Sequence, residues 1–411
     1  MKKQTITLIA GALLAGGVLA GCGNQEAEEP KEEPKQEEQA AEENQAEQNS
    51  EGKENDAEQN AADTNTEAEV NAYQAMMESL SAAKEGNEVE WDKVKSEYQN
   101  NLQEAVTAVN GEFDQAIQAA ISAGQSGELD ANVARQIIDK TTQSYFYQKH
   151  KGLHSDTASA IEAGNTEAAS KIFEDLNLLI DEVIIPTAEK RDSYYELSGE
   201  DSIVENINSG LKAQTEALDA GNADDFGVYK QITDKSIYRS YYLAAQSYAE
   251  KVEKAVQEGN ADETELKIMQ AEGWGFLQAI KGSLAGGDEE AANKLNDLFS
   301  LDKTEPSAIK SEEVSQLFTD AFAGKITSYH EKVPAALEEG EVAEARTEAM
   351  EANVFLKAIE MDLADKLGEE QAESLLDKAQ KWYEAVAAEN AEEASKLSEE
   401  ITSSVKEVAS K

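Results

Sequence analysis

A helical hydrophobic period runs from Val70 to the C-terminus and constrains the fold more than any other feature of the chain. Apolar side chains recur three and four residues apart, as at Val70, Tyr73 and Met77, which is the spacing of one face of a helix. We find no convincing strand pattern. The five prolines among 411 residues also favour helices over a strand-and-turn architecture. The sequence therefore predicts an all-α fold.

The predicted helix ends share a signature in which a glycine follows the last turn. It is found at Gly86-Asn87, Gly164-Asn165, Gly221-Asn222, Gly259-Asn260 and Gly340. Glycine readily adopts the left-handed conformation just past a helix, and asparagine caps the helix that follows. The signature predicts repeated helical hairpins joined by tight turns.

The hairpins belong to an internal repeat. Residues 136–165 align without gaps on residues 231–260, with eight identities in thirty positions. A fainter third copy begins near Val314, where Tyr329 matches Tyr248. Repetition of this kind indicates stacked helical units.

About three helical-bundle units are therefore expected after the N-terminal region. We place them at residues 70–186, 187–306 and 307–411, because Pro186 and Pro306 stand near the joints. Each unit is large enough to bury a bundle core of its own. The repeat leaves open whether the units are independent domains or one continuous array.

The N-terminal sequence has the pattern of a targeting signal. Lys2 and Lys3 precede an apolar run over residues 6–19, which is too short and glycine-rich for a comfortable membrane span. The run ends in Leu19-Ala20-Gly21-Cys22, which resembles the lipobox of bacterial lipoproteins. The resemblance implies removal of residues 1–21 and attachment of lipid to Cys22, which places the protein outside the cytoplasm, anchored to the membrane. The alternative is an ordinary secretory signal with an incidental cysteine.

Residues 22–69 are expected to form a disordered acidic tether. The segment is rich in Glu, Gln, Asn and Ala, and low hydrophobicity with high charge cannot offset the entropy of ordering. Its carboxylates could also capture cations, but a solvated spacer is the simpler interpretation.

Composition excludes several classes of function. With 36 basic and 84 acidic residues the formal net charge is −48, which argues against nucleic acid as a partner. A single cysteine excludes a disulfide framework and a thiolate zinc cluster. No nucleophile elbow, phosphate-binding glycine loop or metalloprotease helix is present. We therefore expect a protein that is not an enzyme.

The three histidines are candidate ligands for a metal ion or haem. His150 and His154 are four residues apart and share a helix face, and the repeat places His330 at the position of His154. Inward-facing histidines with nearby carboxylates are how helical bundles hold metals and haem. The alternative is a set of core histidines hydrogen-bonded to tyrosine or carboxylate, with Gly152 breaking the helix between the first two.

Two glutamates extend this candidate site. Glu272 stands beside Gly273 and Gly275 in an apolar helical run, and its counterpart in the third copy is Glu351. Glycines inside a helix indicate close approach of another helix or a kink beside a ligand. A buried carboxylate needs a partner or a cation. Glu272 could instead cap a kinked helix or meet a tyrosine.

The hairpin ends and the run Glu272-Gly273-Trp274-Gly275-Phe276 resemble the helical extracytoplasmic regions of bacterial iron permeases and imelysin-like iron-uptake lipoproteins, over residues 70–411. The resemblance implies iron or haem as the ligand. The chain departs from both patterns. It lacks the R-E-x-x-E motif of the permeases, and Thr157 stands where a G-x-H-x-x-E motif would have its acidic residue.

These observations predict a non-enzymatic lipoprotein at the cell surface. Its expected role is an accessory or substrate-binding component of cation uptake, with iron as the first candidate. Its expected partners are the membrane, through the lipid, and a permease or another envelope protein. The alternative is a structural or interaction scaffold that binds no small ligand.

Overall fold

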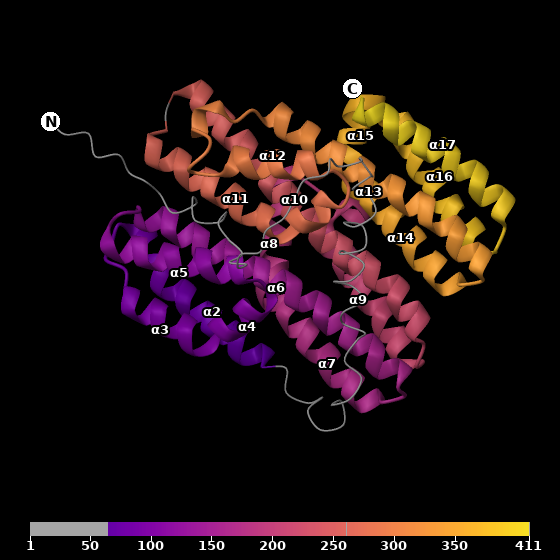
Figure 1. Ribbon diagram of the computed structural model, residues 1–411, viewed down its shortest axis with the longest axis horizontal. Helices are drawn as coiled ribbons and strands as arrows, with labels where there is room; N and C mark the ends of the chain where they lie inside the picture. The colour runs from indigo at the N-terminus through magenta and orange to yellow at the C-terminus, as the bar shows by residue number, and fades with distance from the viewer. Residues whose placement is uncertain (1–64, 260, 411) are drawn as a thin grey trace, which may run out of the picture. The chain divides into compact units, whose positions relative to one another are not determined.

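The computed structural model describes residues 65–259 and 261–410, and their regular structure is helical throughout, without a strand (Figure 1). This confirms the predicted all-α fold. None of the helices in these two ranges is long and apolar enough to cross a membrane. The predicted signal at residues 1–21, the lipid site at Cys22, tether residues 22–64 and Asn260 lie outside the described residues.

The first group of helices precedes the sharp turn at Glu196. In chain order they are α2 (Thr66–Ser81), η1 (Ala82–Glu85), α3 (Trp91–Asn101), α4 (Gln103–Val109), α5 (Gly111–Ser126), α6 (Ala131–Glu162), α7 (Thr166–Leu179), the π-helical turn η2 (Ile180–Ile184) and α8 (Ile185–Tyr195). Helix α2 begins at Thr66 and therefore includes the last four residues of the predicted tether, which was expected to end at Glu69. Glu69 is buried there and accepts a hydrogen bond from Tyr145 of α6.

The remaining helices continue the pattern to the C-terminus. They are η3 (Gly199–Asp201), α9 (Ile203–Asp219), α10 (Ala223–Glu258), α11 (Glu263–Ala285), α12 (Glu289–Phe299), η4 (Pro306–Ala308), α13 (Ser311–Glu339), α14 (Val342–Ala358), α15 (Glu360–Leu367), α16 (Glu369–Ala387) and α17 (Ala391–Ala409). The predicted division after Pro186 falls inside α8, and the one after Pro306 falls inside η4.

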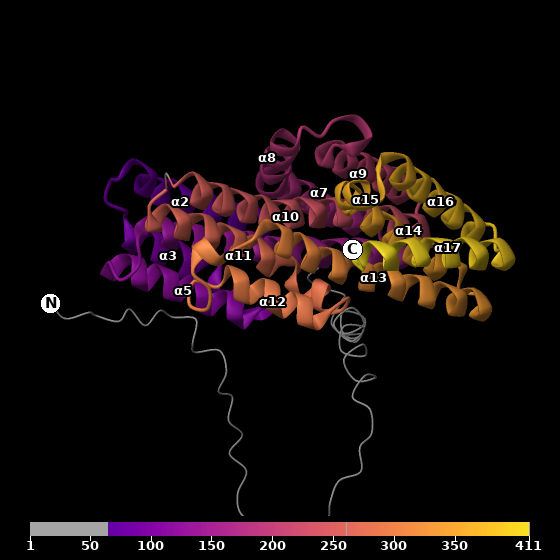
Figure 2. The ribbon, with the colours of Figure 1, turned by 90° about the horizontal axis from the view of Figure 1, so that it is seen from above.

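The three long helices α6, α10 and α13 carry the three copies of the repeat. Each packs against the helix that follows it, as α10 does against α11 in Figure 2. Helix α6 also packs against α11, and α10 also packs against α14. Each of the first two long helices is thus covered by the second helix of the next copy. One buried apolar cluster runs from α2 to α17. The helical copies therefore pack as a continuous array.

The turns between helices follow the predicted chemistry. Gly164 and Gly221 have φ of 68° and 65°, and the side chains of Asn165 and Asn222 accept hydrogen bonds from the first turns of α7 and α10. Gly86 also has a positive φ, but Asn87 caps no helix, because α3 begins only at Trp91. Helix α6 runs unbroken through Gly152, so this residue does not interrupt it.

Helix α11 approaches its neighbours closely through its glycines. A Cβ atom added to Gly275 would lie 2.3 Å from Cβ of Lys140 on α6, and one added to Gly273 would lie 2.4 Å from the ring of Phe299. These distances are shorter than van der Waals contact. The glycines therefore mark close helix approach, one of the two features that the sequence predicted.

We expect Gly275→Ala to lower the free energy of unfolding by about 1–3 kcal/mol, because the new methyl group must displace Lys140 or separate α6 from α11. The matched control is Gly282→Ala on the same helix, where an added Cβ would meet nothing within 4 Å. That change should stabilise by about 0.4–1 kcal/mol. Urea unfolding of both variants measures the difference. Equal effects of the two changes would contradict the close packing.

Candidate functional site

Charged side chains meet in the buried core where α10 packs against α13 and α14, a place that we call the second junction. Lys235 Nζ lies 2.7 Å from Asp234 Oδ2 and 2.8 Å from Glu351 Oε1. The Tyr329 hydroxyl donates a hydrogen bond to Glu351. The Lys235 ammonium also lies 5.0 Å from the ring centroid of Phe355. One lysine thus links two carboxylates from two helices.

The electrostatics of the second junction favour its ionised state. Burial alone would lower the pKa of Lys235, but Asp234 and Glu351 outweigh it and raise that pKa well above its usual value. Burial opposes ionisation of the two carboxyl groups as well, yet the Lys235 charge holds both of their pKa values below the usual range. All three groups therefore carry full charges, and the single ammonium lies between two carboxylates.

The same arrangement recurs one repeat earlier, where α6 packs against α10 and α11, and we call this place the first junction. Its members Asp139, Lys140, Tyr248, Glu272 and Phe276 correspond to Asp234, Lys235, Tyr329, Glu351 and Phe355. Lys140 Nζ lies 2.8 Å from Asp139 Oδ2 and 4.8 Å from the Phe276 ring centroid. The internal repeat in the sequence is therefore a repeat of buried contacts.

Stacked tyrosines complete the match between the junctions. The Tyr248 ring lies 6.1 Å from Phe276 at an interplanar angle of 15°, and Tyr329 lies 6.1 Å from Phe355 at 19°. Burial raises the pKa of Tyr248, and its hydrogen bond to Glu272 raises it further. Glu272 thus meets a tyrosine, as one of the two sequence interpretations predicted.

The two junctions differ in charge balance. Lys235 contacts two carboxylates, whereas Lys140 forms an ion pair with Asp139 alone among the described residues. Glu351 is 9% exposed, but Glu272 is only half-buried. At the first junction the lysine therefore has no second carboxylate in contact, whereas at the second junction Glu351 is in contact with Lys235.

His150 joins the second junction from α6. Its Nε2 atom lies 3.1 Å from Asp234 Oδ1, and its Nδ1 atom contacts the Tyr147 carbonyl oxygen. The Tyr147 hydroxyl donates to the same Asp234 oxygen. Burial lowers the pKa of His150, and Asp234 opposes that shift. Both ring nitrogens thus face oxygen acceptors, which fixes the ring in place.

His154 lies one turn further along α6, with its ring centroid 5.5 Å from that of His150. It is fully buried, and neither of its ring nitrogens has a hydrogen-bond partner within standard geometry. Burial lowers its pKa well below the usual value, and only Asp234 and the nearby Gln214 side chain oppose this. No described group therefore binds either ring nitrogen within standard hydrogen-bond geometry, and Gln214 is the polar side chain that approaches the ring.

Two of the other predicted ligands, His330 and Glu272, lie apart from this pair. His330 stacks on Trp382 with ring centroids 3.8 Å apart, and its Nδ1 lies 3.0 Å from Ser398 Oγ. Burial lowers its pKa to about 3. Of the five predicted ligands, the structure brings His150 and His154 together and links Glu351 to them through Lys235 and Asp234. His330 and Glu272 have separate surroundings.

A metal ion needs more ligands than this pair offers in the arrangement described. Within residues 65–259 and 261–410 no group of three or more His, Cys, Asp or Glu side chains could hold a metal ion. Asp234 is the carboxylate nearest to the pair, and it is already bound to Lys235. It would have to exchange that contact to act as a third ligand.

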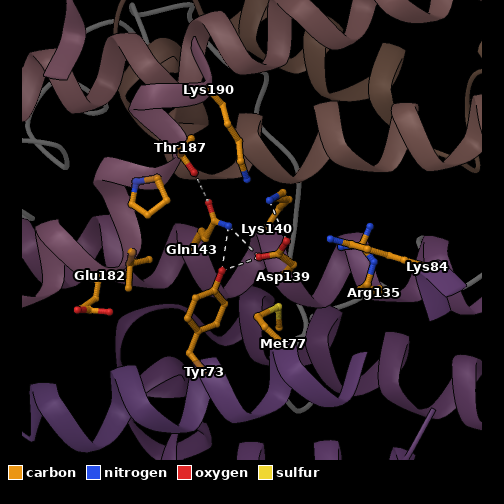
Figure 3. Close-up of a pocket in the computed structure, with 12 residues that line it drawn as sticks. Tyr73, Met77, Lys84, Arg135, Asp139, Lys140, Gln143, Glu182, Thr187 and Lys190 are labelled. Atoms are coloured by element: carbon orange, nitrogen blue, oxygen red, sulfur yellow. Dashed lines mark hydrogen bonds and ion pairs between the residues drawn. The ribbon is translucent and has the colours of Figure 1, made fainter. Parts of the chain in front are cut away.

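A second polar feature is a cavity of about 150 Å³ between α2, α6 and α8, beside the first junction (Figure 3). Asp139 accepts hydrogen bonds from Tyr73 at 2.7 Å and from Gln143 at 2.8 Å. The Thr187 hydroxyl donates to Gln143 Oε1 at 3.2 Å. These bonds fix the polar wall of the cavity.

Comparison with protein-family models, curated proteins and solved structures gave no match. The resemblance to iron-uptake lipoproteins therefore stays a prediction, and the site rests on its own geometry.

Sequence analysis missed Asp139, Lys140, Asp234 and Lys235 as members of the junctions. A signal was present, because the Asp-Lys pair is identical in residues 136–165 and 231–260. Charged residues repeated at the same place in an apolar helix indicate a contact that recurs within the array. No comparable signal marks the cavity.

Proposed function

We propose that this chain is a non-enzymatic lipoprotein, held at the outer side of the cell membrane by lipid on Cys22. Its helical array would serve cation uptake as an accessory or substrate-binding component. The lipobox supports the anchor. The observation that carries the binding role is His154, because a fully buried imidazole without a hydrogen-bond partner is rare and calls for an explanation such as a ligand.

In this proposal His150 and His154 are the ligands of the cation, and Asp234 supplies negative charge beside them. Imidazole nitrogen suits iron, copper, zinc and nickel. Both rings lie on one long helix, which holds their centroids 5.5 Å apart. Entry of a cation would require His150 to exchange its contact with Asp234, since that contact occupies its Nε2 atom.

The second candidate function is a scaffold that binds no small ligand. Lys235 forms ion pairs with Asp234 of its own helix and with Glu351 of α14, which is the arrangement expected of a contact that holds helices together. Gln214 Oε1 also lacks a partner, and a small rotation toward His154 would satisfy both side chains.

Metal and haem binding to the purified protein separates the two functions. We expect one equivalent of iron, or a Soret band after haem addition, for the unchanged chain and for His330→Ala. His154→Ala should lose it, because His154 supplies the free nitrogen. His330→Ala is the matched control, since it removes a buried histidine elsewhere in the array.

Elemental analysis and absorbance spectra give the readout, with circular dichroism to confirm that each variant folds. Absence of iron and haem from the unchanged chain would support the scaffold. Equal retention by both variants would also remove His154 from the proposed site.

A further inference from the structure

We propose that the cavity between α2, α6 and α8 is a binding site for a small oxyanion of the phosphate or sulfate class. The site is separate from the histidine pair, and the proposal does not depend on the cation role. It rests on the charge around the cavity, on the buried and unpaired Arg135, and on the size of the space.

Positive charge dominates the lining of the cavity, although the whole chain carries a net charge of −48. Four cationic side chains from three elements line it: Lys84 of η1, Arg135 and Lys140 of α6, and Lys190 of α8. Figure 3 shows the Lys190 side chain extending toward Lys140 and Asp139. Only two carboxylates, Asp139 and Glu182, belong to the same lining.

These two carboxylates do not neutralise the four cations. Asp139 pairs with Lys140 at 2.8 Å. Glu182 accepts a hydrogen bond from Gln74 at 2.7 Å, and Figure 3 shows its carboxylate on the far side of Tyr73 from Lys84 and Arg135. Lys84, Arg135 and Lys190 have no ion pair within the described part of the chain.

Arg135 is the strongest single indication of a ligand. It is 9% exposed, and its buried Nε atom has no hydrogen-bond partner. A guanidinium group is always charged and presents donors in a planar fork that matches an oxyanion. Burying such a charge without a partner is costly. An oxyanion in the cavity would supply the missing acceptor.

The lysines at the mouth also favour an anion. Lys84 and Lys190 are exposed, so a ligand can reach the cavity from solvent. Burial lowers the pKa of Lys190, and the charges of Lys140, Lys84 and Arg191 lower it further against the opposing effect of Asp139. A bound anion would relieve this mutual repulsion.

The size and the wall of the cavity limit the ligand. An apolar cavity of roughly this volume in another protein holds one benzene ring, so about 150 Å³ suits a single small oxyanion rather than a nucleotide. The π-helical turn η2 contributes Glu182 to the wall, and such turns are frequent at functional sites.

The second junction explains why the site occurs in the first repeat. There the counterpart of Lys140 is Lys235, which binds Glu351 as well as Asp234. Asp234 also accepts a hydrogen bond from the Tyr147 hydroxyl and contacts the His150 ring. The first junction has no such second carboxylate on Lys140, which leaves room for an anion from solvent, and the surplus of positive charge at the cavity comes from Lys84, Arg135 and Lys190.

Isothermal titration calorimetry of the full chain with inorganic phosphate and with sulfate, at constant ionic strength set by chloride, tests the proposal. We expect saturable binding of one anion per chain. Lys190→Gln should weaken it by about tenfold or more, because it removes a charged donor. The matched control is Lys212→Gln, at an exposed lysine of α9 away from the cavity lining, which should change the affinity less than twofold.

Arg135→Met provides a second test, with circular dichroism to show that the variant folds. Loss of binding in Arg135→Met and Lys190→Gln, but not in Lys212→Gln, supports the site. Three outcomes would overturn it: no saturable binding, equal binding by all variants, or chloride competing as well as phosphate and sulfate. Lys190→Gln keeps the test decisive if Arg135→Met does not fold.

Discussion

Lys235→Met should destabilise the protein by about 3–5 kcal/mol, because it leaves Asp234 and Glu351 buried without their common partner. Methionine has nearly the length of lysine and fills the same space, so the loss comes from charge rather than from a cavity. Lys235 lies between both carboxylates at less than 3 Å.

Urea unfolding followed by circular dichroism measures this effect. Lys212→Met is the matched control and should change stability by less than about 0.5 kcal/mol, as exposed substitutions usually do. The triple variant Lys235→Met, Asp234→Asn and Glu351→Gln should recover more than half of the loss, because none of the three side chains then carries a charge. A loss below about 1 kcal/mol for the single variant would show that the junction is not a structural ion network.

Lys140→Met gives the comparison within the array. Lys140 neutralises Asp139 only, and Asp139 keeps its hydrogen bonds from Tyr73 and Gln143. We therefore expect a smaller loss than for Lys235→Met. A loss equal to or larger than that of Lys235→Met would contradict the different charge balance of the two junctions.

The helices and their hairpins could be predicted because the information is local. Apolar spacing defines a helix face, and a glycine followed by asparagine ends one helix and caps the next, as Gly164 and Asn165 do. The burial of His150 and His154 could also be predicted from the sequence, since both lie on the apolar face of α6. Both are fully buried.

The partners of these residues could not be predicted, because they depend on which helices meet. His150 contacts Asp234 and Lys235 contacts Glu351, and each pair joins helices that are distant in sequence. The cavity is harder still to predict from the sequence. Its lysines and arginine come from η1, α6 and α8, and in the sequence each is an ordinary charge on a helix surface. Only the packing of three helices makes them one cluster.

Acid should destabilise the fold between about pH 6.5 and pH 4 because all three histidines are buried. Burial lowers the pKa of His150, His154 and His330, the last to about 3, while the unfolded chain has the ordinary value near 6.5. In this window the unfolded state binds more protons than the folded state, so stability falls as pH falls. Above the unfolded value the contribution of the histidines is complete.

The expected slope of the unfolding free energy against pH follows from the number of buried histidines. Each histidine contributes up to about 1.4 kcal/mol per pH unit, so three contribute up to about 4 kcal/mol per unit in the window. Asp139, Asp234 and Glu351, whose pKa values are lowered, act in the same direction only below about pH 4. Asp156 acts in the opposite direction, because partial loss of solvent around its carboxyl group raises its pKa. The residue lies at the surface, so this effect is small.

His330→Phe isolates one of the three contributions. Phenylalanine can keep the stacking on Trp382, which His330 makes at 3.8 Å, and it loses only the contact with Ser398. We expect the slope between pH 6 and pH 5 to fall by about 1.4 kcal/mol per unit. Urea unfolding at these two pH values measures it. An unchanged slope would mean that His330 is protonated in the folded state, which its burial against Trp382 opposes.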